Sequence, residues 1–343
     1  MSSIKHLSKE VDRSLTMSCP WLYKNPRYKL SLCVAAVLEV RSCNTMEIAA
    51  ALPLPTERID MRYQWLSRFL QTSTVDNEQV MKPFASQLID HVYKTGSTIV
   101  LCIDQTSVND DHGILCISIR LENRCLPLFW RTKKGLGNIG FKEQKELLDL
   151  VAALIPKNAQ VLLLGDRFYG SAELIHDLNL RNWDYRLRLK GNLTVDTGDK
   201  SCKTGDLAQN VPPKGAHFTD VLLTDKLVTC NLGIVHEKGH DEPWIIAMKG
   251  DPNYYKTMDY GLRWGIESMF SDFKTRGFGL EDTHLEHGDR LSRLMLVLSL
   301  ALHWAVLTGI VDAKQNPLPQ EKKQMNSDMP FTILTALKQL YQQ

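Results

Sequence analysis

Acidic side chains in this sequence of 343 residues occur where a phosphoryl-transfer or hydrolytic site could form. Asp104 follows the apolar run from Thr98 to Ile103, and Asp166 follows the run from Val161 to Leu164 and one glycine. Both runs predict buried strands, and α/β sheets place functional groups at the carboxyl ends of strands. Either aspartate alone could be a turn residue or a helix cap, so the pair is more informative than either member.

A third set of polar side chains lies between Asp259 and Arg276, a segment that we predict to be one long helix. At about 100° per residue, four of them form a single stripe about 60° wide: Tyr260, Arg263, Glu267 and Lys274. The stripe should border the buried face, which we expect to be Leu262, Ile266, Met269, Phe270 and Phe273. Asp272 lies away from the stripe and is predicted to be a solvated charge. Charged residues on a helix also serve solubility alone, and that alternative stays open.

These residues resemble the motifs of a known family. The spacing Tyr260-x2-Arg263-x3-Glu267-x6-Lys274 is similar to the YREK motif of bacterial insertion-sequence DDE transposases of the insertion-sequence-four type. The segments VLCIDQTSV around Asp104 and LLLGDRFYG around Asp166 resemble the two aspartate motifs of that family. The resemblance extends over most of the chain.

The resemblance implies that two Mg²⁺ ions, for which Mn²⁺ can substitute, are bound by three catalytic carboxylates: Asp104, Asp166 and Glu267. Oxygen ligands of this kind suit Mg²⁺. Two metal ions about 3.5–4 Å apart stabilise the attacking and leaving oxygens of an in-line displacement at phosphorus.

The resemblance also implies which side chains bind DNA phosphate beside the scissile bond: Tyr260, Arg263 and Lys274. Arg and Lys neutralise phosphate, and Tyr donates a hydrogen bond. Further implications are an RNase H-like core, a homodimer that pairs two transposon ends, and hairpin excision in some members. The expected partner is double-stranded DNA, as terminal inverted repeats and as target DNA, and no membrane is expected.

Two further places are candidates for DNA contact. The run from Asp184 to Lys190 alternates like a strand and puts its basic residues on one face: Arg186, Arg188 and Lys190. A wholly basic outer face suits a phosphate backbone, although a solvated face is the default alternative. Trp264 falls on the solvent side of the stripe, where it could stack on an unpaired base. The alternative is that residues 191–250 or the apolar segment from Leu294 to Val311 cover it.

The order of the predicted strands and helices indicates an α/β protein with an N-terminal helical domain and a β-rich insertion. The resemblance implies that its mixed-sheet core is RNase H-like. Residues 1–95 are helical and mildly basic, and either bind the DNA ends or only pack. Residues 96–190 and 251–311 form the two parts of the core, and residues 191–250 form the insertion. Residues 312–343 are predicted to be a linker and an amphipathic helix that carries Phe331, Leu334, Leu337, Leu340 and Tyr341.

Composition narrows the class of protein. With 43% hydrophobic and 23% charged residues the chain is neither disordered nor of low complexity. Because the net charge is only +2, nucleic-acid binding must be inferred from the distribution of basic residues and not from their total. The eight cysteines form no CxxC pair, and the polar N-terminus has no signal-peptide pattern. We therefore expect a reduced, cytoplasmic protein, and the resemblance implies a bacterial one that is associated with the nucleoid.

The segment from Leu294 to Val311 approaches the length of a membrane span. It contains several polar residues and has no second segment like it, which favours a buried core helix.

The leading interpretation is an active DDE transposase that cleaves DNA at insertion-sequence ends with Mg²⁺ and transfers the strand to target DNA. A nuclease on the same RNase H-like core, without strand transfer, would use the same carboxylates. A DNA-binding regulator derived from a transposase is the alternative from another class. The intact carboxylates of Asp104, Asp166 and Glu267 argue against it.

Overall fold

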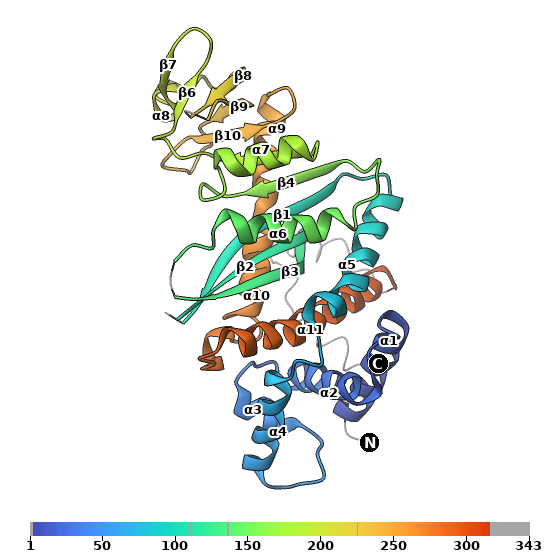
Figure 1. Ribbon diagram of the computed structural model, residues 1–343. Coiled ribbons are helices and arrows are strands. Elements are labelled where there is room, and N and C mark those ends of the chain that lie inside the picture. Colours follow the sequence, from blue (N-terminus) through green and yellow to red (C-terminus); the bar gives the residue numbers. More distant parts are fainter. Residues whose placement is uncertain (1–2, 110, 136, 225, 316–343) are drawn as a thin grey trace.

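The computed structural model describes residues 3–109, 111–135, 137–224 and 226–315 (Figure 1). A group of N-terminal helices precedes a mixed sheet of ten strands with helices packed on it. This architecture confirms the predicted mixed α/β class. The RNase H-like assignment and the domain bounds stay predictions, and the predicted amphipathic helix over 331–341 lies outside the described residues.

The N-terminal helices are α1 (Ser3–Ser18), α2 (Lys24–Val40), α3 (Thr45–Ala51), α4 (Ile59–Gln71) and α5 (Asn77–Lys94). Side chains start two of them: Asn44 accepts a hydrogen bond from the N–H of Met46, and Asp76 accepts one from the N–H of Gln79. Helix α2 is buried continuously from Leu30 to Leu38. It therefore forms the centre of this helical group.

The strands are β1 (Ile99–Val108), β2 (His112–Leu121), β3 (Arg124–Lys134), β4 (Val161–Gly165), β5 (Asp184–Arg188), β6 (Thr194–Asp196), β7 (Ser201–Lys203), β8 (Ala216–Leu223), β9 (Val228–Val235) and β10 (Trp244–Met248). Their order is β3-β2-β1-β4-β5-β10-β9-β8-β6-β7. Strand β4 runs parallel to β1 and to β5, and the other pairs are antiparallel. The segment predicted as a β-rich insertion supplies β6 to β10, which continue the same sheet because β10 pairs with β5.

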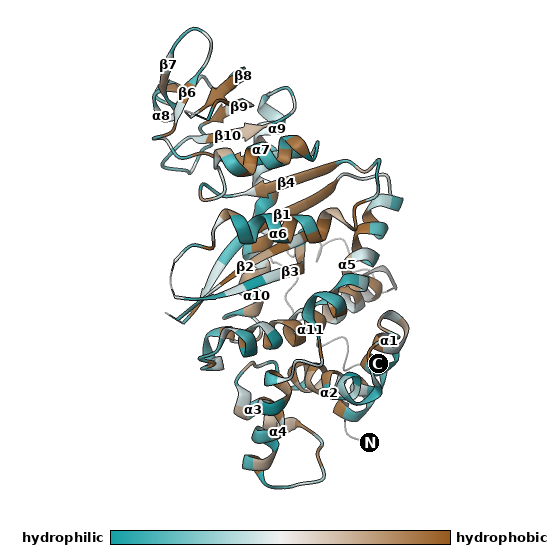
Figure 2. Cartoon of the chain, viewed as in Figure 1, coloured by the Kyte–Doolittle hydropathy of each residue, from teal (hydrophilic) through white to brown (hydrophobic). Residues whose placement is uncertain are grey.

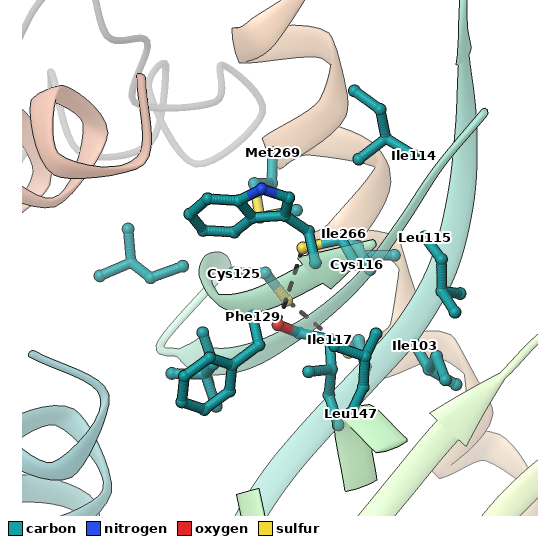
Figure 3. Close-up of a cluster of buried hydrophobic side chains, with 14 of the residues drawn as sticks. Ile103, Ile114, Leu115, Cys116, Ile117, Cys125, Phe129, Leu147, Ile266 and Met269 are labelled. Atoms are coloured by element: carbon teal, nitrogen blue, oxygen red, sulfur yellow. Dashed lines mark hydrogen bonds between the residues drawn. The ribbon is translucent and has the colours of Figure 1, made fainter. Parts of the chain in front are cut away.

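The later helices are α6 (Phe141–Ala152), α7 (Ala172–Leu180), α8 (Thr204–Leu207), α9 (Tyr254–Met258), η1 (Asp259–Arg263), α10 (Trp264–Phe273), η2 (Leu280–Thr283) and α11 (Gly288–Gln315). Helices α6 and α10 lie on opposite faces of β1 to β3 (Figure 1). In Figure 3, Ile266 and Met269 of α10 lie on the Cys116 side of the strands, and Leu147 of α6 lies on the Ile117 side. Figure 2 shows hydrophobic residues along β4 and hydrophilic residues on much of α6. The sheet is thus the middle layer of three.

Helix α11 joins the helical group to the sheet, because it packs on α2, α4 and β3. Within the described residues it is the one helix long and apolar enough to cross a membrane, and 72% of its most apolar window is buried inside the protein. Its apolar side chains from Leu294 to Leu302 are buried, as predicted for a core helix. The helix continues to Gln315, beyond its predicted end at Val311.

Asp272 contradicts the prediction of a solvated charge, since it is only 3% exposed. Its Oδ2 accepts a hydrogen bond from Nη1 of Arg124 at 2.5 Å. Burial raises the pKa of Asp272, and Arg124 opposes that shift. The prediction was wrong because the start of β3 packs over the side of α10 that a helical wheel assigns to solvent.

Replacing Asp272→Ala should lower the free energy of unfolding by about 3–5 kcal/mol, because the Arg124 guanidinium would lose the carboxylate that compensates it. Urea denaturation measures the change. The control is Glu286→Ala at an exposed carboxylate, which should stay within about 0.5 kcal/mol of the parent. Equal effects of the two substitutions would contradict a stabilising buried pair.

His303 predicts a pH dependence of stability. It is 6% exposed and packs edge-on against Phe84 at 5.3 Å between ring centroids. Burial lowers the pKa of His303 from 6.5 to about 4. The folded state therefore binds this proton less tightly than the unfolded state, so the stability from neutral His303 is complete above pH 6.5 and is lost as the pH falls to about 4.

The variant His303→Phe should remove this dependence, which amounts to about 3 kcal/mol. Urea denaturation at pH 7 and pH 4.5 compares the variant with the parent. The substitution His91→Phe at an exposed histidine should leave the parental pH dependence in place. A parental dependence that persists in His303→Phe would assign it to other groups.

Candidate active site

Two neighbouring strands bring Asp104 and Asp166 together. Strands β1 and β4 are parallel with Ile103 opposite Gly165, so the aspartates that follow lie side by side, across a strand spacing of about 4.8 Å. Asp166 directly follows β4, as predicted. Asp104 lies inside β1 and not at its end, because the strand continues along β2 to Val108.

The turn after β4 holds Asp166 in place. Its Oδ1 accepts a hydrogen bond from the N–H of Phe168 at 2.8 Å. A side chain at Gly170 would lie 2.3 Å from the carbonyl oxygen of Arg188, so only glycine lets this turn approach β5 so closely. The glycines of the GDRFYG segment are therefore part of how the aspartate is positioned.

Tyr169 is a residue of this turn that the sequence did not single out. It is 1% exposed, and its hydroxyl is a buried group with no hydrogen-bond partner in the described structure. Burial raises its pKa, and the charges of Asp104 and Asp166 raise it further. The phenol therefore stays neutral and lies within electrostatic reach of both carboxylates. In the sequence, the signal that could have identified it was a tyrosine three residues after Asp166.

Arg263 connects Asp104 to Glu267. Its Nη1 donates a hydrogen bond to Oδ2 of Asp104 at 3.1 Å, and its Nη2 donates one to Oε1 of Glu267. The Arg263 and Asp104 side chains are 13% and 16% exposed, whereas Glu267 is 45% exposed. Two of the three predicted metal ligands thus share one guanidinium, and the third, Asp166, directly follows the strand adjacent to β1.

The three carboxylates also act on one another electrostatically. Burial raises the pKa of Asp104 to about 6, Arg263 opposes this rise, and the charges of Asp166 and Glu267 add to it. Like charges gathered in this way favour binding of a cation.

The donor set fits Mg²⁺ in type, since all three side chains offer carboxylate oxygens. In the part of the chain that the structure describes, no three His, Cys, Asp or Glu side chains are grouped as a metal site. Arg263 lies between Asp104 and Glu267 instead. A metal ion bound by these two residues would compete with Arg263, since one oxygen of each carboxylate accepts a hydrogen bond from its guanidinium.

The polar stripe does not lie on one helix, so the predicted helix from Asp259 to Arg276 is wrong in extent. Residues Asp259–Arg263 form the 3-10 turn η1, where the carbonyl oxygen of Leu262 accepts a hydrogen bond from Nη1 of Arg120 at 2.7 Å. Helix α10 begins at Trp264 and ends at Phe273.

Lys274 lies just beyond α10, with φ −92° and ψ −121°. Its Nζ forms an ion pair with Glu281 at 3.0 Å. The chain turns here because Phe278, which is fully buried, folds back so that its N–H bonds the carbonyl oxygen of Asp272. Lys274 therefore stands apart from the helical stripe that the wheel predicted.

Tyr260 is 4% exposed and packs edge-on against Trp244 at 5.0 Å between ring centroids. The guanidinium carbon of Arg263 lies 5.6 Å from the centroid of the Tyr260 ring, a distance typical of a cation–π contact. Burial raises the pKa of Tyr260, and Arg263 opposes that rise. The ring of Tyr260 thus helps to position the guanidinium of Arg263.

Trp264 is 44% exposed. Its ring lies 5.7 Å from that of Trp244 and 5.9 Å from that of His240. His240 and Trp244 belong to the segment predicted as the insertion. Trp264 is therefore open on one side, as the stacking prediction requires, and covered by the insertion on the other.

The basic strand differs from its prediction at Arg186, which is only 3% exposed. Its guanidinium is held by the carbonyl oxygen of Lys256 and by the carboxylates of Asp184 and Asp259. The face is not wholly outward because α9 and η1 pack over this part of β5. Arg188 is partly exposed and pairs with Glu242 at 3.5 Å, and Lys190 is exposed.

Residues 142–304 match the family model of the transposase DDE domain. The match supports a DDE transposase. The matched DDE segment includes Asp166 and Glu267 and begins after Asp104. No curated protein matches the chain. The insertion-sequence-four type, the YREK assignment and the individual site residues stay predictions.

Replacing Trp264→Ala should lower the free energy of unfolding by about 1–2 kcal/mol, because contacts to two aromatic rings would be lost. Guanidinium denaturation measures the loss, and Trp264→Phe, which keeps a ring in place, should recover at least half of it. A loss above about 4 kcal/mol would instead make Trp264 a core residue, and the stacking prediction would fail.

Proposed function

We propose that the protein is a Mg²⁺-dependent transposase of the insertion-sequence-four type, which cleaves DNA at insertion-sequence ends and joins the strand to target DNA. The observation that carries the proposal is the shared neighbourhood of three carboxylates: Asp104, Asp166 and Glu267. The transposase DDE match supports the reaction class. The YREK spacing supports the type.

The three carboxylates would hold two Mg²⁺ ions, or Mn²⁺ in their place. When bound, these ions supply charge stabilisation to the attacking and leaving oxygens at phosphorus. The chain prepares the ligands in advance: Oδ1 of Asp104 accepts the N–H of Gln105 at 2.8 Å, and Oδ1 of Asp166 accepts the N–H of Phe168. One oxygen of each aspartate is thus oriented by the backbone.

DNA phosphate beside the scissile bond would be bound by Arg263 and Lys274, with Tyr260 as a hydrogen-bond donor. Trp264 would stack on an unpaired base through its open side. Arg188 and Lys190 would contact the backbone of the duplex farther along, and buried Arg186 would contribute by holding their strand in position.

The proposed partner is double-stranded DNA, as terminal inverted repeats and as target, bound by a homodimer that pairs two ends. Helices α1 to α5 would bind the ends. The proposed location is the bacterial cytoplasm, at the nucleoid.

The variant Asp166→Asn should lose cleavage of supercoiled DNA that carries the element's ends, by at least about 100-fold, since an amide replaces a metal-binding carboxylate. DNA binding should remain close to the parental level, because basic residues supply most of the affinity. Gel assays with and without Mg²⁺ measure cleavage, and mobility shifts measure binding.

The control is Asp149→Asn on α6, whose carboxylate is 52% exposed on the opposite face of the sheet and should keep full cleavage. Equal loss of binding and cleavage in Asp166→Asn would assign a structural role to this residue. Parental cleavage without joined products would indicate a nuclease, and binding without any Mg²⁺-dependent cleavage would indicate a regulator.

A further inference from the structure

The Arg263 guanidinium binds one oxygen of each of two carboxylates that are proposed to bind the metal ion. Nη1 is bound to Oδ2 of Asp104 at 3.1 Å, and Nη2 is bound to Oε1 of Glu267. The Arg263 and Asp104 side chains are 13% and 16% exposed, so this ion pair is largely shielded from water, whereas Glu267 is 45% exposed. A guanidinium and a divalent cation beside the same two carboxylates repel each other, so each weakens the binding of the other.

The two ion pairs do not involve Nε of Arg263. Its Nε is buried and has no hydrogen-bond partner in the described structure. A buried donor without an acceptor is energetically unfavourable. A phosphate group presents several acceptor oxygens that match the guanidinium fork, so it would satisfy this side chain more completely than the two carboxylates do.

The backbone at Arg263 is fixed, which confines any exchange to its side chain. Arg120 donates a hydrogen bond to the carbonyl oxygen of Leu262 at 2.7 Å. A side chain at Gly265 would lie 3.0 Å from Sγ of Cys125, so the start of α10 lies close against β3. The guanidinium can leave the carboxylates by side-chain rotation while the helix stays in place.

We propose that Arg263 is a counterion that withholds Asp104 and Glu267 from Mg²⁺ until a DNA phosphate draws the guanidinium away. The inference rests on the proposed function and deepens it: Mg²⁺ and DNA bind cooperatively because each favours the same rotated state of Arg263. Such coupling is reciprocal, so Mg²⁺ must raise the affinity for DNA by the factor by which DNA raises the affinity for Mg²⁺. Under this proposal the free protein carries little metal.

The test is the Mg²⁺ affinity of the full-length protein without DNA, measured by calorimetry at pH 8. Arg263→Ala should bind Mg²⁺ at least tenfold more tightly than the parent, although it should cleave DNA poorly. Arg263→Lys keeps the charge but cannot bridge both carboxylates, so its Mg²⁺ affinity should lie between the two. Melting temperatures establish that each variant is folded, and Arg263→Lys provides the comparison if Arg263→Ala is not.

The matched control is Arg167→Ala, which removes a positive charge from the same edge of the sheet. Arg167 follows Asp166, is 52% exposed and pairs with Glu242 at 3.2 Å. Its removal should change the Mg²⁺ affinity less than threefold. An equal gain in both variants would reduce the effect to the general field of a positive charge and overturn the proposal.

The second measurement is the affinity for a labelled duplex that ends at the cleavage position, so that no bond remains to be cut. Mg²⁺ should raise this affinity at least tenfold in the parent and less than threefold in Arg263→Ala. Equal Mg²⁺ affinity of parent and Arg263→Ala would overturn the role of Arg263 and leave the proposed function standing. Absence of Mg²⁺ binding in every protein, with and without the duplex, would overturn both.

Discussion

Gathering three carboxylates beside two neighbouring strands, β1 and β4, is electrostatically unfavourable, and much of the surrounding structure compensates for it. The parallel register of β1 and β4 forces Asp104 and Asp166 into adjacent positions. Burial raises the pKa of Asp104 to about 6, and the charges of Asp166 and Glu267 add to that rise. Arg263 compensates for part of it, and its own place depends on the ring of Tyr260 and on the anchoring of η1 by Arg120.

Apolar packing keeps that arrangement rigid. Ile266 and Met269 of α10 pack on the sheet that carries Asp104, and Leu147 of α6 packs on the opposite face of that sheet (Figure 3). Helix α11 packs on β3 and on α2, so the sheet and the N-terminal helices share one core. The carboxylates can therefore be held close together because the elements beneath them have little freedom to relax.

The sequence pattern predicted correctly those features that depend on residues close together in the chain. The strand before Asp166, the buried α11 and the mixed α/β class follow from runs of apolar residues and their lengths. The features that were predicted wrongly depend on contacts between residues distant in sequence. Arg120 holds the carbonyl of Leu262 and so fixes a 3-10 turn where periodicity predicted helix, and β3 covers Asp272 on a side that a helical wheel leaves open. Burial of Arg186 likewise depends on α9, some 70 residues later.

Four basic side chains around the carboxylates each form an ion pair with an acidic residue of the same chain. Arg263 is paired with Asp104 and Glu267, Lys274 with Glu281, and both Arg167 and Arg188 with Glu242.

For a chain of net charge +2, DNA binding at this edge would therefore be an exchange of partners, in which phosphate replaces carboxylate. Exchange yields less free energy than contact with unpaired cations, because each carboxylate released must be solvated again or bound by another cation. Under the proposed function, the metal-binding carboxylates are the ones for which another cation is available. The geometry therefore favours DNA most where Mg²⁺ can take the place of the guanidinium, which is at the reacting phosphate and not elsewhere on the surface.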